Sequence, residues 1–263
     1  MKGCDDMRTV KLEEMNTRSF AESGFDTAIV PIGACESHGE HMPFGTDGLT
    51  SHALAVKIAE QCEKTFVLPA YYLGMSTHYR HKPINITLTN DTQIRVLTEV
   101  LESLHHWGLR KVLILNGHDG NIPCAEIAAR DVKVRHPEMS LAVFDWWTIL
   151  AQMLPADTFE IWAGFGHAGE VETSIGLALF PELMDMERAR GQIPTRLDPF
   201  VKEIWTFDEI TGYGASGAAE KGTPEKGALI VDAVIRYMTE YMQRFERDGL
   251  RYDPVDALEY PNR

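Results

Sequence analysis

The first two thirds of the chain alternate short apolar runs with longer segments of helical periodicity. The apolar runs are rich in β-branched residues, which favours strands at residues 27–32, 65–68, 112–115 and 141–144. Each run is followed by a helical pattern, and strands that alternate with helices are typical of βαβ units. The pattern therefore predicts an α/β fold with a mostly parallel central sheet.

Two helical segments have an apolar face that can be read from the sequence. Before the third strand, Asp91 is expected to cap a helix that ends before Gly108. Its apolar face carries Ile94, Leu97, Leu101 and Leu104. Near the end of the chain, a second stripe predicts a buried helix face formed by Ile230, Val234, Tyr237, Tyr241 and Phe245. Residues 193–223 lack periodicity and are expected to form a loop over one face of the domain.

Composition narrows the class of protein. The chain has 263 residues, of which 44% are hydrophobic, and its 25 basic and 39 acidic side chains give a net charge of −14. This profile indicates a globular protein, which we expect to form one domain over residues 1–263. No apolar run approaches the roughly 18 to 20 residues that span a bilayer. The acidic balance and the lack of a Lys/Arg cluster argue against nucleic-acid binding and favour a small-molecule substrate.

The cysteines and the first residues favour a reduced, cytoplasmic setting. Cys4, Cys35, Cys62 and Cys124 lie far apart and form no Cys-x-x-Cys pair, so neither a zinc ribbon nor a redox motif is expected. Nothing near Cys35 suggests an activated nucleophile. The first twenty residues mix charged and polar side chains where a signal peptide would be apolar.

Side chains that suit a metal centre follow two of the predicted strands. Glu36, His38 and Asp47 come after the first strand, with Asp47 expected at the N-cap of the next helix. His118 lies in a glycine-rich turn after the third strand. Ligands of open α/β sheets bind at the carboxyl ends of the strands, so two clusters at that edge predict a site there.

A third cluster, around His167, adds an imidazole and the carboxylates of Glu170 and Glu172. Histidine and carboxylates without cysteine suit Zn, Mn or Fe in a catalytic site that keeps a position open for water. Two such cations roughly 3.5 to 4 Å apart would hold a hydroxide and polarise a carbonyl, which is the chemistry of hydrolysis. Either Glu170 or Glu172 could reach a metal.

Other features have simpler interpretations. Five histidines lie on predicted loops or helix faces without ligand partners and are interpreted as structural or solvated, namely His41, His52, His105, His106 and His136. Residues 212–217 match Gly-x-Gly-x-x-Gly, the only support for a nicotinamide-dependent oxidoreductase. No strand of the right kind precedes them, so we interpret them as a flexible loop that borders the site.

The three clusters together resemble the motifs of the creatininase (creatinine amidohydrolase) family. The motifs are Gly-x-x-Glu-x-His-Gly followed by Gly-Thr-Asp, then Asn-Gly-His-x-Gly-Asn, then His-Ala-Gly-x-x-Glu-Thr-Ser, and the resemblance extends from about Val30 to Ala233. It implies a three-layer α/β/α sandwich, a homo-oligomer that is often a hexamer, and two divalent metal ions per subunit (Zn, Mn or Fe). It also implies hydrolysis of C–N bonds in cyclic or formyl amides.

Carried over by motif, the resemblance implies the roles of individual residues. His167 resembles the acid/base that protonates the leaving nitrogen. Asp47 resembles the carboxylate that bridges the two metals. The implied ligand set is Glu36, His38, Asp47, His118 and Glu172.

The chain departs from the family at two places. Creatininase itself has a metal-binding glutamate where this chain has Gly120, so the chain resembles the branches in which the last motif supplies the carboxylate, and creatinine is not the expected substrate. Residues 78–85 also differ, which predicts another pocket, in which Arg80 and Lys82 could meet an anionic group. We expect substrate contacts from His78, Arg80, Asp119, Trp146 and Trp147.

These observations predict a metal-dependent amidohydrolase in which a metal-bridging hydroxide attacks the amide carbon of a cyclic amide or related small molecule. His167 then gives a proton to nitrogen. Two alternatives use the same site: a deformylase of formylamino-pyrimidine nucleotides, or a hydrolase of a cyclic ketone or lactone-like ring. A further alternative is a non-catalytic metal-binding protein.

Overall fold

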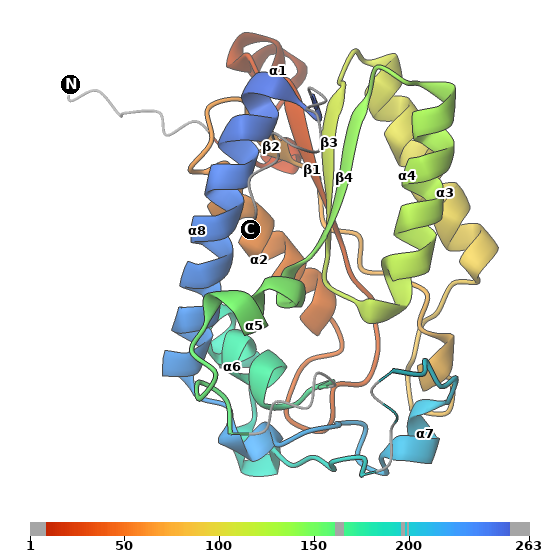
Figure 1. Ribbon diagram of the computed structural model, residues 1–263, viewed down its shortest axis with the longest axis vertical. Helices are drawn as coiled ribbons and strands as arrows, with labels where there is room; N and C mark the ends of the chain where they lie inside the picture. Colours follow the sequence, from red (N-terminus) through yellow and green to blue (C-terminus); the bar gives the residue numbers. More distant parts are fainter. Residues whose placement is uncertain (1–8, 161–165, 196–197, 199, 253–263) are drawn as a thin grey trace, which may run out of the picture.

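The computed structural model describes residues 9–160, 166–195, 198 and 200–252, and a parallel sheet forms its central layer (Figure 1). The strand order is β2-β1-β3-β4. The strands are β1 (Thr27–Ile32), β2 (Thr65–Val67), β3 (Lys111–Asn116) and β4 (Ser140–Asp145). Every residue of β1 is buried, which explains its uninterrupted apolar sequence.

Helices cover both faces of the sheet. On one side α3 packs against α4, and on the other side α2 and α8 lie together, with α6 packed on α8 (Figure 1). The main helices are α1 (Thr17–Ser23), α2 (Thr46–Ala59), α3 (Asn90–His106), α4 (Ile122–Arg135), α6 (Glu170–Leu179) and α8 (Pro224–Asp248). This arrangement confirms the predicted three-layer α/β/α architecture.

The shorter helices lie in the connections between these elements. They are η1 (Leu12–Glu14), η2 (Thr77–Tyr79), η3 (Asp119–Asn121), η4 (Trp146–Ile149), α5 (Leu150–Met153), η5 (Pro181–Leu183), η6 (Met186–Arg188), α7 (Phe207–Ile210) and η7 (Ala219–Lys221). No described helix is long and apolar enough to span a membrane.

The predicted strands are confirmed, but two helix details are wrong. Helix α3 is capped by Thr89, whose side chain accepts a hydrogen bond from the backbone of Thr92, and not by Asp91. In α8 the buried face carries Met238 and Met242, while Tyr237 is 42% exposed. Position 237 lies beside 238 and 241 beside 242, so both stripes fit a helical period, and the flexible methionines fill the core.

The register of the sheet decides where the site forms. Strands β1 and β3 pair along their whole length, so Ile32 lies opposite Asn116. The segments that leave these two strands, which carry Glu36 and His118, therefore start side by side. The predicted loop 193–223 contains α7 and η7 but otherwise no regular helix or strand among its described residues, and part of it lies over this edge.

Candidate metal centre and active site

Two glycines bring the start of α2 against the ends of β1 and β3. A Cβ atom on Gly33 would lie 2.3 Å from the backbone nitrogen of Gly48, and one on Gly117 would lie 2.2 Å from the carbonyl oxygen of Asp47. Any larger residue at these positions would push α2 away. The expected helix cap is wrong, because Gly45 occupies the N-cap position and the Asp47 side chain makes no capping bond.

The carboxylate of Asp47 instead lies between two imidazoles. Its Oδ1 is 2.9 Å from Nε2 of His38, and its Oδ2 is 3.2 Å from Nδ1 of His118. Glu36 Oε1 lies 3.2 Å from the same Nδ1. These four side chains, from three separate segments, are all buried. The sequence-predicted ligands from the first two motifs are thus brought together.

Two carboxylate oxygens in this cluster make no well-formed hydrogen bond among the described residues, and their nearest polar neighbour is His118 Nδ1 at 3.2 Å. They are Glu36 Oε1 and Asp47 Oδ2, both fully buried. Buried polar atoms are normally paired, and a buried charge without compensation is costly. A divalent cation would compensate both oxygens, so the residues present fit a metal centre.

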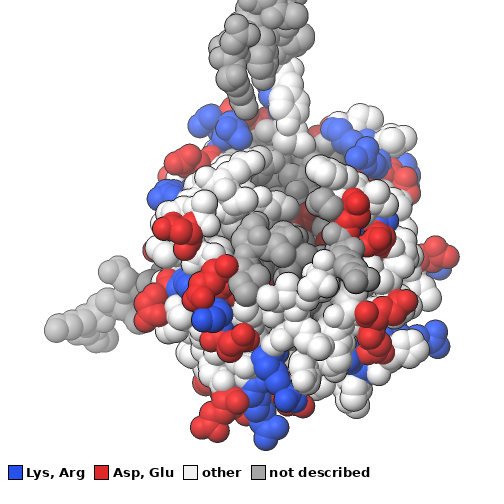
Figure 2. All heavy atoms as spheres, turned by 60° about the horizontal axis from the view of Figure 1, so that its bottom comes forward, with Lys and Arg blue, Asp and Glu red and all other residues white. Residues whose placement is uncertain are grey.

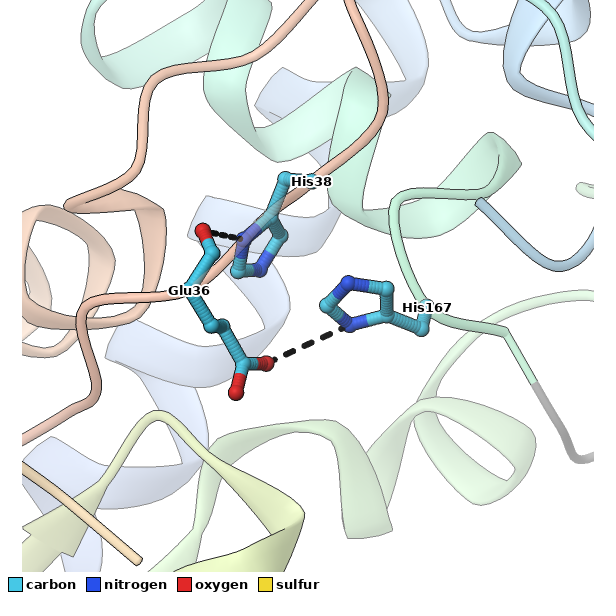
Figure 3. Close-up of side chains that lie close together, drawn as sticks. All are labelled: Glu36, His38 and His167. Carbon is cyan, nitrogen blue, oxygen red and sulfur yellow. Dashed lines mark hydrogen bonds and ion pairs between the residues drawn. The ribbon is translucent and has the colours of Figure 1, made fainter. Parts of the chain in front are cut away.

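Backbone carbonyls orient the two imidazoles that face the cluster with Nδ1. Nε2 of His118 is 2.9 Å from the carbonyl oxygen of Met75, and Nε2 of His167 is 2.7 Å from that of Ser37. An Nε2–H group that donates to a carbonyl leaves Nδ1 to act as a ligand or base. Figure 3 shows Nδ1 of His167 directed toward Glu36, at 3.7 Å from Oε1.

The carbonyl oxygen of Met75 leaves no room for a side chain at position 120, two residues after His118. A Cβ atom on Gly120 would lie 2.2 Å from the Met75 oxygen and 2.5 Å from Nε2 of His118. A glutamate at position 120 would require the backbone of both segments to move. A further carboxylate ligand must therefore come from another part of the chain.

The two glutamates in the first turn of α6 contact different partners. Glu172 Oε2 accepts a hydrogen bond from the backbone of Ala168 and lies 3.8 Å from both His38 Nε2 and His167 Nδ1. Glu170 points elsewhere, to Nζ of Lys226 at 2.5 Å. Of the two glutamates that the sequence left open, the geometry brings Glu172 into the cluster.

The described donors form three overlapping groups whose ligand atoms lie within 4.8 Å of one another. The groups are Glu36–His38–His167, Glu36–His78–His118 and His38–Asp47–Glu172. All five predicted ligands occur in them, and His78, expected to contact substrate, joins as a further possible donor. Nitrogen and carboxylate donors of this kind bind a divalent metal.

Opposite charges shift the pKa values of the innermost groups. Burial by itself would lower the pKa of His38, but attraction to Asp47 and a hydrogen bond with it raise that pKa to about 9. Burial likewise opposes the charged form of His118, yet the carboxylates of Glu36 and Asp47 raise its pKa well above the ordinary value. The Asp47 carboxyl is stabilised as an anion, mainly by His38, and its pKa is lowered despite burial.

His167 and Glu172 are shifted in the direction of their neutral forms. Burial, with repulsion from His38, lowers the pKa of His167 well below its ordinary value. Burial raises the pKa of Glu172 to about 7. At neutral pH, His167 therefore has no proton on Nδ1, and Glu172 can gain or lose one.

The donor cluster forms the floor of a cavity of about 510 Å³. Four of the five predicted substrate-binding residues line it, namely His78, Asp119, Trp146 and Trp147. Arg80 is exposed and does not line the cavity with the other four, so its contact with substrate stays a prediction. The charge of Lys82, which was considered for an anionic group of the substrate, is paired with Asp208, at 2.9 Å from Nζ. Figure 2 looks onto this end of the molecule, where basic and acidic side chains are mixed.

Aromatic rings pack against the imidazole of His167. The Tyr79 ring lies 4.5 Å from the His167 ring and 4.1 Å from that of Phe207, and Phe207 lies 4.8 Å from His167. Tyr79 and Phe207 are almost completely buried. This packing excludes water from one face of His167 and holds the ring in place.

The glycine-rich segment 212–217 supports His167 and does not form a nucleotide fingerprint. Ser216 exchanges backbone hydrogen bonds with His167 at 3.2 and 2.8 Å, and its Oγ accepts another from the His167 backbone at 3.0 Å. No strand precedes the segment among described residues 166–211. It borders the site, as expected, and the oxidoreductase alternative loses its only support.

Ser76, which sequence reasoning missed, and His41, which it interpreted as structural or solvated, hold the ligands in place. Ser76 Oγ donates a short hydrogen bond to Glu36 Oε2. His41, buried and interpreted as structural or solvated, lies 2.9 Å through Nε2 from Thr173 Oγ1 and so joins the Glu36 loop to α6. Neither has a sequence signal, because each contact depends on segments far apart in the chain.

Comparison with known proteins shows which family the chain matches. Residues 13–242 match the family model Creatininase, described as creatinine amidohydrolase. Creatinine amidohydrolase of Pseudomonas putida is 25% identical over 226 residues, covering 79% of this chain and 85% of that protein. 3-Dehydro-scyllo-inosose hydrolase of Thermotoga maritima is 28% identical over 259 residues, covering 89% and 80%.

Solved structures have the same fold. A crystal structure of a Bacteroides fragilis protein superposes with a TM-score of 0.83 at 27% identity, covering 93% of this chain and 99% of that one. Two creatininase structures, described as a zinc–zinc form and a manganese form, each give a TM-score of 0.76. The zinc–zinc form is 22% identical to this chain and the manganese form is 23% identical. Each alignment covers 92% of this chain, together with 99% of the zinc–zinc form and 100% of the manganese form.

Proposed function

Because the chain belongs to the creatininase family, we propose that it is a divalent-metal-dependent hydrolase that cleaves the C–N bond of a cyclic amide or related small molecule. The observation that carries the proposal is the convergence of the buried Glu36 and Asp47 carboxylates with three imidazoles, those of His38, His118 and His167, under one cavity. Buried carboxylates need positive charge beside them, and divalent cations would supply it in place of the protons on His38 and His118.

The proposed ligands divide into two overlapping sets. Glu36 and His118 would hold one ion, His38 and Glu172 the other, and Asp47 has one oxygen toward each set, which supports its role as the bridge. Divalent cations, with Zn, Mn and Fe as candidates, supply Lewis acidity there and make water a stronger nucleophile at neutral pH.

His167 is the proposed acid/base. Its Nε2 proton is held on the Ser37 carbonyl, so proton transfer takes place at Nδ1, which faces the cluster. The lowered pKa makes Nδ1 free to accept a proton from the attacking water and then to pass it to the leaving nitrogen. The packed rings of Tyr79 and Phe207 hold the imidazole in this orientation.

The cavity supports a substrate larger than a single small ring. Its volume of about 510 Å³ falls within the roughly 300–1,000 Å³ range of pockets for drug-sized ligands. Trp146 and Trp147 offer flat walls. The blocked space at Gly120 supports a substrate other than creatinine.

Among the alternatives, ring opening by the same site is the stronger one. The similarity to an inosose hydrolase, over 89% of this chain, favours it. The nucleotide deformylase is weaker, because Lys82 is paired with Asp208 and Arg80 lies outside the cavity. The complete donor set argues against a non-catalytic metal-binding protein.

The first test is the metal content of the purified chain beside that of Glu36→Ala and His118→Ala. We expect about two equivalents of divalent metal in the parent protein and loss of metal and turnover in both variants. The loaded protein is then screened against cyclic amides, formylamino compounds and inosose-type rings. Absence of bound metal, with no gain on reconstitution, would sink the proposal.

His167→Ala tests the proton-transfer step separately. It should retain metal and lose rate by about 10²- to 10⁴-fold, the usual contribution of general acid–base catalysis. A fully active variant would remove His167 from the mechanism.

Three further expectations stay predictions. They are a single domain over residues 1–263, a cytoplasmic location and a homo-oligomer, with a hexamer implied by the family. Sedimentation of the purified chain measures the oligomeric state.

A further inference from the structure

A second group of imidazoles and carboxylates lies at the opposite end of the sheet. Glu102 and His105 lie near the end of α3, and His136 follows the last residue of α4. These helices lead into β3 and β4, so their ends lie at the amino edge of the sheet, away from the candidate active site (Figure 1). One donor atom of each of the three residues lies within 4.8 Å of the other two.

The two imidazoles of this group are stacked. Their ring centroids are 3.7 Å apart, with an interplanar angle of 24°. Each Nε2 faces a carboxylate: that of His105 lies 2.6 Å from Glu138 Oε1, and that of His136 lies 2.7 Å from Glu102 Oε2. The side chains of His105 and His136 are 21% and 22% exposed, so solvent reaches the group.

Arginine side chains fix the carboxylates without covering every oxygen. Arg135 Nε binds Glu102 at Oε1, at 2.8 Å, which leaves Oε2 toward the imidazole. Arg110 Nε lies 3.7 Å from Glu138 Oε1. The two guanidinium groups offset the charge of the two carboxylates, so we expect a cation to bind here more weakly than in the buried centre.

We propose that Glu102, His105 and His136, with Glu138 beside them, bind one late first-row divalent cation such as Zn²⁺, Ni²⁺ or Cu²⁺. Imidazole with carboxylate is a donor set that these ions prefer, whereas Mg²⁺ and Ca²⁺ prefer oxygen donors only. The ion would join the ends of α3 and α4 at a place that does not contact the candidate active site.

The test is a Zn²⁺ titration of the metal-free, full-length chain against a chromophoric chelator. We expect one equivalent beyond those of the buried centre, and we expect His105→Ala and His136→Ala each to weaken that equivalent by at least about tenfold while the buried centre stays filled. His118→Ala should do the reverse. His106→Ala is the matched control, because His106 is an exposed neighbour on the same turn and lies outside the group.

A second readout uses stability in the His38→Ala/His118→Ala background, in which both ligand sets of the buried centre have lost a histidine. Zn²⁺ should raise the melting temperature, and the additional change His136→Ala should abolish that rise. If the parent chain binds no extra equivalent, or the variants at 105 and 136 bind as it does, the group is only a hydrogen-bonded link between two helices. Either result overturns the proposal and leaves the proposed hydrolase function untouched.

Discussion

The two ends of the sheet carry the same kinds of side chain in different settings. At the carboxyl end, Glu36, His38, Asp47 and His118 are buried below a cavity, and two carboxylate oxygens make no well-formed hydrogen bond among the described residues. At the amino end, the carboxylate beside His136 is fixed by an arginine and the group is open to water. Imidazoles and carboxylates therefore define a metal-binding surface, and burial with unsatisfied oxygens under a cavity defines a candidate active site.

The neighbouring glutamates of α6 give the sharpest test of this difference. Glu172→Gln should lower metal affinity by more than about 10- to 100-fold and reduce turnover, because it removes a carboxylate from the cluster. Glu170→Gln should keep the metal but destabilise the fold by about 3 kcal/mol, since it leaves the Lys226 ammonium without its anionic partner. Elemental analysis and urea unfolding of both variants measure the two effects. Loss of metal in Glu170→Gln, with metal retained in Glu172→Gln, would show that Glu170 is the ligand.

His41→Ala tests the link between the first metal loop and α6. It removes the hydrogen bond to Thr173 inside the core, and we expect a loss of about 2 kcal/mol in the free energy of unfolding, with weaker metal retention. His52→Ala is the control, because His52 is partly exposed and lies 3.5 Å from Glu13, outside the cluster. Equal stability of the two variants in denaturant titrations would argue against the link.

The pKa shifts predict how metal binding depends on pH. His38, with a pKa of about 9, and Glu172, with a pKa of about 7, must lose their protons before they can coordinate. Metal affinity of the metal-free protein should therefore rise from pH 6 to pH 9, by about tenfold per pH unit for each proton released. Chelator competition at several pH values measures the slope, and a flat profile contradicts the assignment of both residues as ligands.

The smallest effect is expected at the amino end. In the double variant His105→Ala/His136→Ala, turnover should be unchanged and the free energy of unfolding only slightly lower, because exposed ion pairs contribute little. Steady-state rates and thermal melts check both statements. A large loss of turnover would mean that the two ends of the sheet are coupled.

The sequence by itself determined the strands, the α/β class and the edge at which the candidate site lies. Buried strands need uninterrupted apolar runs, and this requirement is local, so β1 was predicted with its observed bounds. Residues that follow parallel strands meet at one edge of the sheet. This rule predicted that Glu36 and His118 lie close together, as the structure shows.

Only the tertiary structure decided which side chains pair. Asp47 was predicted to cap α2, but the close approach at Gly33 and Gly117 turns it toward two imidazoles. The choice between Glu170 and Glu172 depended on Lys226, which lies on another helix. His105 and His136 were interpreted as structural or solvated, and the structure shows them stacked because α3 and α4 end side by side. Periodicity describes one element at a time, whereas such contacts depend on how separate elements pack.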